Sequence, residues 1–174
     1  MHPAKSITVV LLFTACAASA AHMAAPDVPP AVAVPAGHKP SMTLTGVGQL
    51  TYECRAKADA SGAHEWVFVG PDATLKDAAG KPVGKYYAGP TWEHNDGGRI
   101  TGKQLAVAPG ATGAIPLQLV QTASAMAPGA FDGVTYIQRV NTMGGIAPAA
   151  ACDASTAGRR QVVNYSADYV FYKP

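Results

Sequence analysis

The sequence predicts an all-β fold, either an antiparallel sandwich or a closed barrel, in a single domain held by one disulfide. Short apolar runs that alternate with polar residues recur along the chain, and turns rich in glycine separate them. No segment has a convincing helical period, and residues 117–127 are the best candidate for a short helix. A series of short strands is typical of sandwiches and barrels, and the sequence does not choose between the two.

The N-terminus has the features of an export signal over residues 1–20. Lys5 supplies a positive charge, residues 7–15 form an apolar run too short to span a bilayer, and residues 18–20 give a small-x-small cleavage pattern. We therefore expect a secreted or periplasmic protein. Cys16 lies in a loose lipobox, so lipid anchoring at Cys16 is the alternative to ordinary cleavage.

A spacer is predicted to follow the signal. Residues 21–40 are rich in proline and alanine and have no amphipathic period, so they are expected to be extended. The sequence leaves open whether they pack against the rest of the protein. Residues 41–174 are then expected to form the single β domain.

The strand predictions run in chain order from residue 42. Alternation over 42–54 predicts a half-buried strand with a glycine bend, and it directs Cys54 inward. The further elements are a strand over 66–69 closed by Gly70 and Pro71, a hairpin turn at 77–80, a turn at 95–98 leading into a strand over 99–107, and strands over 115–121, 131–140 and 163–171. The last is the clearest, because five apolar or aromatic residues from Val163 to Phe171 share one face.

Cys54 and Cys152 are the only cysteines after the signal. Two thiols in an oxidising compartment most simply form one disulfide, which here closes a loop of about 100 residues. A redox or metal role would need a Cys-x-x-Cys pair or a Cys/His cluster, and the sequence has neither.

Charge and motifs argue against several functions. The chain has 13 Lys and Arg against 11 Asp and Glu, a net charge of +2, and these charges are scattered, so nucleic-acid binding is not expected. No apolar run of transmembrane length follows the signal. There is no P-loop, no GxGxxG after a strand, no GxSxG and no HExxH, so we expect neither a cofactor nor a metal.

Several motifs together resemble a known family. They are GQLTYEC (48–54), the strand at Trp66, the run from GPDATLKDAAG to GPTWEHNDGG (70–98), VTYIQRVNTMGGIAP (134–148) and YSADYVFY (165–172). The chain resembles a secreted family of bacteria and fungi known as domain of unknown function 3455, over nearly all of the sequence after the spacer. The resemblance implies export and a single compact domain, and it implies no chemistry.

The densest polar cluster is the segment 92–96. Glu93 and Asp96 could act as paired carboxylates, or His94 with Asp96 could form half of a metal site. The preferred interpretation is structural, because Asn-Asp-Gly-Gly is favourable turn chemistry and Glu93 is then a strand residue facing water.

A second cluster contains Arg139 and Asn141, which share one face of the predicted strand. Arg139 either pairs with a carboxylate, for which Glu93, Asp96 and Asp168 are candidates, or binds an anionic ligand. The ion pair is the preferred interpretation.

Aromatic residues form the third candidate group. Tyr86, Tyr87 and Trp92 are close enough in sequence to line one surface, as aromatic platforms do for sugar rings, although aromatics on alternating strands more often fill the core. Tyr165 and Tyr169 are assigned to the core.

Three functions follow from these candidates. The preferred one is a non-enzymatic binding domain for a glycan or another cell-envelope ligand, with a site built from Tyr86, Trp92, Glu93, Arg139 and Asn141. The second is a hydrolase in which Glu93 or Asp96 is the base and Arg139 stabilises negative charge. The third is a structural or inhibitory secreted protein.

Overall fold

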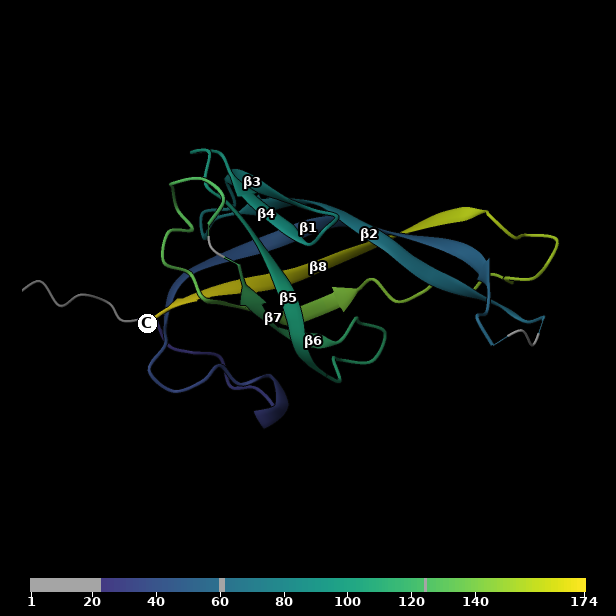
Figure 1. Cartoon of the computed structure of the whole chain (residues 1–174), viewed down its shortest axis with the longest axis horizontal. Coiled ribbons are helices and arrows are strands. Elements are labelled where there is room, and N and C mark those ends of the chain that lie inside the picture. The colour runs from purple at the N-terminus through teal and green to yellow at the C-terminus, as the bar shows by residue number, and fades with distance from the viewer. Residues whose placement is uncertain (1–22, 60–61, 124) are drawn as a thin grey trace, which may run out of the picture.

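The computed structural model describes residues 23–59, 62–123 and 125–174, so the predicted signal and Cys16 lie outside the described residues. Its strands form one closed antiparallel barrel in which each strand pairs with the next and the last pairs back to the first (Figure 1). The strands are β1 (Lys39–Ala56), β2 (His64–Lys76), β3 (Pro82–Tyr87), β4 (Thr91–His94), β5 (Arg99–Ala108), β6 (Leu117–Thr122), β7 (Tyr136–Gly144) and β8 (Arg160–Lys173). The all-β prediction is confirmed, and the barrel is the correct one of its two alternatives.

Helices contribute almost nothing to the described part of the chain. It contains one 3-10 turn, η1 (Pro30–Val32), and no α-helix. The short helix considered for residues 117–127 was wrong, because residues 117–122 form β6. None of the described residues belongs to a helix long and apolar enough to cross a membrane.

Strand β2 differs most from its prediction, since it continues through Gly70 and Pro71 instead of ending there. The β1–β2 register shifts at this point: Thr51 pairs with Gly70 and Tyr52 with Phe68, so Val69 is an extra residue. A bulge tolerates a proline next to it, because the ladder is already interrupted there. The predicted stop is therefore an irregularity inside a longer strand.

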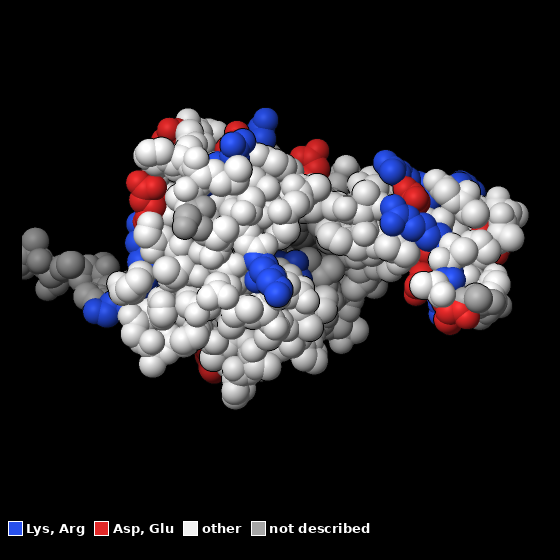
Figure 2. Space-filling model, in the orientation of Figure 1, with Lys and Arg blue, Asp and Glu red and all other residues white. Residues whose placement is uncertain are grey.

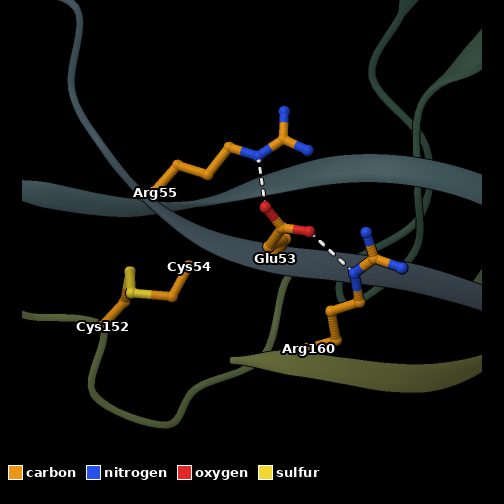
Figure 3. Close-up of polar contacts among 5 residues, drawn as sticks. All are labelled: Glu53, Cys54, Arg55, Cys152 and Arg160. Atoms are coloured by element: carbon orange, nitrogen blue, oxygen red, sulfur yellow. Dashed lines mark hydrogen bonds and ion pairs between the residues drawn. A yellow bond between two sulfur atoms is a disulfide. The ribbon is translucent and has the colours of Figure 1, made fainter. Parts of the chain in front are cut away.

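The longest strands extend beyond the barrel as a ribbon. Figure 1 shows one end each of β1, β2 and β8 projecting to the right of the other strands. The Cys54–Cys152 disulfide, with 5.5 Å between the Cα atoms, ties the segment before β8 to β1 in this ribbon. Beside it, Glu53 accepts hydrogen bonds from Arg55 Nε at 2.8 Å and from Arg160 Nε at 2.7 Å (Figure 3). The predicted disulfide is confirmed.

The barrel interior is the main core. The five residues of β8 predicted to share a face supply four fully or almost fully buried side chains, Tyr165, Ala167, Tyr169 and Phe171. One part of the interior is filled by bulky groups: Trp92 stacks on Tyr86 with ring centroids 4.7 Å apart, and Phe131 stacks on Phe171 at 4.9 Å.

A second apolar layer lies outside the barrel. Val28, Val32 and Val34, from the segment predicted to be a spacer, pack against the outer faces of β5 to β8 (Figure 1, purple segment). The backbone oxygen of Val32 accepts a hydrogen bond from buried Gln138 Nε2 at 2.6 Å, and Tyr172 donates to Gln138 Oε1 at 2.9 Å. Because this N-terminal segment covers the outside of the barrel, both faces of β8 are buried near its end.

We predict that Cys54→Ser lowers the free energy of unfolding by about 2–5 kcal/mol, because the disulfide constrains a long loop in the unfolded chain. Chemical denaturation in non-reducing buffer measures this. Cys152→Ser is the matched control and should give the same loss, and reductant should destabilise only the wild type. An unchanged stability of Cys54→Ser in non-reducing buffer would contradict the structural role of the disulfide.

Candidate functional site

A cavity of about 570 Å³ opens at the end of the barrel from which the ribbon extends. Every strand except β4 contributes to its walls. Figure 2 shows the molecule hollowed between the barrel body and the ribbon, with basic side chains beside the hollow. The volume lies within the range of small-molecule sites, and the interior of an eight-stranded barrel can hold one small ligand.

Small residues make the room for this cavity. Gly70, Ala88, Gly89 and Gly102 line it. At Gly102 a side chain could not be added without displacement, because a Cβ would lie 2.4 Å from Val120 Cγ1. The walls are otherwise mainly apolar and aromatic, including Leu50, Tyr52, Phe68, Val107 and Ile115. Phe68 and Val107 are about half exposed, at 49 % and 46 %, so the mouth presents apolar surface to water.

The innermost wall of the cavity carries tyrosine hydroxyl groups. Tyr165 and Tyr169 have their hydroxyl oxygens 3.2 Å apart, and the ring centroid of Tyr86 lies 5.0 Å from that of Tyr169. Trp92 packs behind this wall, with its ring centroid 5.7 Å from that of Tyr169. Burial raises the pKa of all three tyrosines above the ordinary value of 10.0, and the nearby positive charge of Arg139 offsets only part of this. The three side chains are therefore neutral at physiological pH and can donate hydrogen bonds.

Arg139 reaches the same cavity from β7, where it pairs in register with Gln118 of β6 and Tyr169 of β8. Its Nε and Nη2 atoms donate to the backbone oxygen of Pro116 at 3.2 and 2.9 Å. Among the described residues it takes part in no ion pair. The preferred expectation of a structural ion pair for Arg139 was therefore wrong.

The three carboxylates considered as partners of Arg139 have other contacts. Glu93 accepts a hydrogen bond from Tyr87 at 2.7 Å, and Asp168 accepts from Thr45 at 2.7 Å and from Asn141 at 2.8 Å. The residues that donate these hydrogen bonds are exposed or half exposed, and they do not line the cavity.

Asp96 is a turn residue. Its Oδ1 accepts from the backbone nitrogen of Gly98 at 2.8 Å and lies 3.0 Å from His94 Nδ1, and its Oδ2 accepts from the backbone nitrogen of Ala130 at 2.8 Å. These contacts, with the bond to Gly98 the largest, hold the pKa of Asp96 below its usual value. The side chain thus joins the turn before β5 to the loop before β7.

The structure brings together only part of the predicted site. Tyr86 and Arg139 line the cavity, whereas Glu93, Asp96 and Asn141 do not. Trp92 is 0 % exposed and lies in the core next to the cavity wall. The carboxylates proposed for hydrolysis therefore do not share a pocket with Arg139, and no group of three or more His, Cys, Asp or Glu among the described residues could hold a metal ion.

Sequence reasoning missed the contribution of Tyr52, Tyr165 and Tyr169, which line the cavity while being almost fully buried. Their assignment to the core considered only the rings. The signal that could have found the last two is their parity: on β8 they face the barrel interior, and Gly46 of the adjacent strand β1 leaves room for the ring of Tyr169, whose Cε2 atom would lie 2.7 Å from a Cβ at that position.

The motif QRVNTMGG (138–145) gains a structural explanation. Gln138 points outward to the N-terminal segment, whereas Arg139 points inward to the cavity, so these neighbouring residues lie on opposite faces of the barrel wall. Asn141, with φ of 49°, lies in the irregularity between Val140 and Met143 where β7 shifts against β8. Gly145 has a φ of 80°, and its backbone oxygen accepts a hydrogen bond from Tyr52 at 2.8 Å.

This motif also lies within the region recognised by comparison with known proteins. The family described as "Protein of unknown function (DUF3455)" matches residues 35–173. The chain belongs to this DUF3455 family. The match begins directly after Val34, the last of the three valines that cover the outer face, and includes every strand of the barrel, so the cavity is built wholly from DUF3455 residues. No curated protein and no solved structure matches the chain.

We predict that Trp92→Ala lowers the free energy of unfolding by about 3–5 kcal/mol, because it removes a fully buried aromatic side chain from the stack with Tyr86. Urea denaturation measures the change. Phe68→Ala is the matched control, an aromatic residue at the exposed mouth, and should cost far less. Equal losses in the two variants would show that Trp92 is not part of the core.

Alkaline pH should destabilise the protein above about pH 10. The buried Tyr86, Tyr165 and Tyr169 have pKa values raised by the fold, so between the ordinary pKa of 10.0 and the higher folded values the unfolded chain releases protons that the folded chain keeps. Their contribution to stability is complete below pH 10 and is lost as the pH rises through the folded values. Denaturation midpoints followed between pH 8 and 11 test this, and Tyr165→Phe should reduce the slope. A stability independent of pH in that range would contradict the burial of these hydroxyl groups.

Proposed function

We propose that the protein is an exported, non-enzymatic binding protein whose barrel holds one small and mainly apolar molecule. The observation that carries this proposal is the cavity of about 570 Å³ with walls of apolar and aromatic side chains. Burying the apolar surface of Phe68 and Val107 at its mouth under a ligand would be favourable.

Export is part of the proposal and has two supports. The N-terminal residues 1–20 carry the pattern of a cleaved signal, and the Cys54–Cys152 disulfide is of the kind that persists in oxidising compartments. Binding without catalysis is supported by the cavity lining: among the described residues that form it there is no histidine, cysteine, serine or carboxylate to act as base or nucleophile.

An apolar ligand fits this site better than a glycan. Sugar recognition needs an open aromatic face with amide or carboxylate groups around it, and Trp92 has no exposed face. The two amides in the cavity wall, Gln104 and Gln118, are hydrogen-bonded to each other. The lining therefore offers few uncommitted polar groups to the many hydroxyls of a sugar.

A neutral fluorescent probe tests the proposal. N-phenyl-1-naphthylamine should bind the purified protein with a rise in fluorescence. Val107→Trp, which places a large ring at the mouth, should weaken this binding by about tenfold or more, because the ring takes space that the probe needs and overfilling costs about 1–3 kcal/mol.

Leu105→Trp is the matched control for this variant. Leu105 lies on the same strand, is 48 % exposed and does not line the cavity, so its replacement should leave the affinity for the probe unchanged. Absence of probe binding to folded protein would contradict the proposal. An equal effect of the two tryptophan variants would place the probe outside the cavity and would also contradict it.

A further inference from the structure

The cavity has an electrostatic asymmetry that its apolar character does not explain. Its lining, drawn from the described residues, contains two basic side chains, Lys103 and Arg139, and no Asp or Glu. Lys103 is exposed, whereas Arg139 is half buried beside the tyrosine wall. A cation that is partly removed from water without an anionic partner is unfavourable, and an anion brought by a ligand would remove that cost.

The guanidinium of Arg139 still has hydrogen-bond donors to offer. It has five N–H groups, and the contacts to Pro116 O occupy Nε and one hydrogen of Nη2. The Nη1 group and the second hydrogen of Nη2 are not used by any hydrogen bond that Arg139 makes with the described residues. Two parallel N–H groups of this kind match the two oxygens of a carboxylate.

The tyrosine hydroxyls add a further donor. Tyr165 and Tyr169 are joined by one hydrogen bond, which uses one of their two O–H hydrogens. One hydrogen therefore remains for a group that can accept it. Arg139 of β7 pairs in register with Tyr169 of β8, which places this donor and the guanidinium on adjacent strands of the cavity wall.

We infer that the ligand is an amphipathic carboxylate, with its carboxylate bound by Arg139 and the tyrosine hydroxyls and its apolar body against Leu50, Ile115 and Phe68. This inference rests on the proposed function and specifies the chemical class of its ligand. A singly charged carboxylate suits the site because apolar walls surround the one half-buried cation. A head group with more negative charges would bury some of them without a positive partner.

The test compares two ligands that differ only in the head group. Decanoate and decanol are each used to displace N-phenyl-1-naphthylamine from the wild-type protein at neutral pH. Decanoate should compete about ten- to hundredfold better, the range expected for hydrogen bonds to a charged group. Equal competition by the two would overturn the inference while leaving the proposed function intact, because the neutral probe would still bind.

Variants then locate the carboxylate. Arg139→Met should lose the preference for decanoate over decanol, measured as the ratio of the two affinities in the variant itself. Arg55→Met removes the same charge from the ribbon, outside the cavity, and should keep the preference. A preference that survives in Arg139→Met, or one that disappears in Lys103→Met instead, would show that the carboxylate binds elsewhere and would overturn the assignment.

If Arg139→Met does not fold, a second variant still tests the inference. Tyr165→Phe takes away one hydroxyl of the wall and should reduce the preference for decanoate over decanol; an unchanged preference would contradict the role of the hydroxyls. If neither the probe nor decanoate binds folded wild-type protein, by fluorescence and by thermal shift, both the inference and the proposed function fail.

Discussion

Closure of the barrel by β1 and β8 is the constraint on which the rest of the structure depends. β8 pairs with β1 along its whole length, from Lys173 opposite Lys39 to Arg160 opposite Glu53. β1 and β8 come from opposite ends of the domain sequence. Bringing them together closes a long stretch of chain at a cost in conformational entropy, and the hydrogen bonds between the two strands and the disulfide at Cys54 must offset that cost. Without this closure the strands that carry Tyr165 and Arg139 would not face Leu50 and Tyr86, and the cavity would have no walls.

The interior of the barrel is divided by the size of its side chains. In one part Trp92 stacks on Tyr86 and Phe131 stacks on Phe171, and these rings fill the space between the strands. Toward the ribbon, glycine and alanine replace bulky residues along the wall, and the interior opens. The filled part makes the open part possible, because a rigid aromatic stack holds Tyr86 and Tyr169 in place while their other sides face the cavity.

Local patterns in the sequence predicted the elements well and the site poorly. Alternation on β8, the glycine turns and the single pair of cysteines are properties of short segments, and each is confirmed. The continuation of β2 through Pro71 depends on a shift against β1, and the burial of Tyr172 depends on Val32 and its neighbours, which lie more than a hundred residues away. The cavity depends on which residues meet across a closed barrel, and these contacts join segments far apart in sequence. Tyr86 and Arg139 could therefore be named as site residues from the sequence, whereas the residues that line the cavity with them could not.

The same long-range packing bears on the position of Arg139. Its neighbour Gln138 is buried on the outer face, held between the backbone of Val32 and the hydroxyl of Tyr172. Because successive residues of a strand point to opposite faces, fixing Gln138 from outside also fixes the direction in which Arg139 enters the barrel. The N-terminal segment is thus part of the structure that supports the cavity, even though it does not touch it. A guanidinium held in this way is preorganised for an anion, since little side-chain freedom is left to lose on binding.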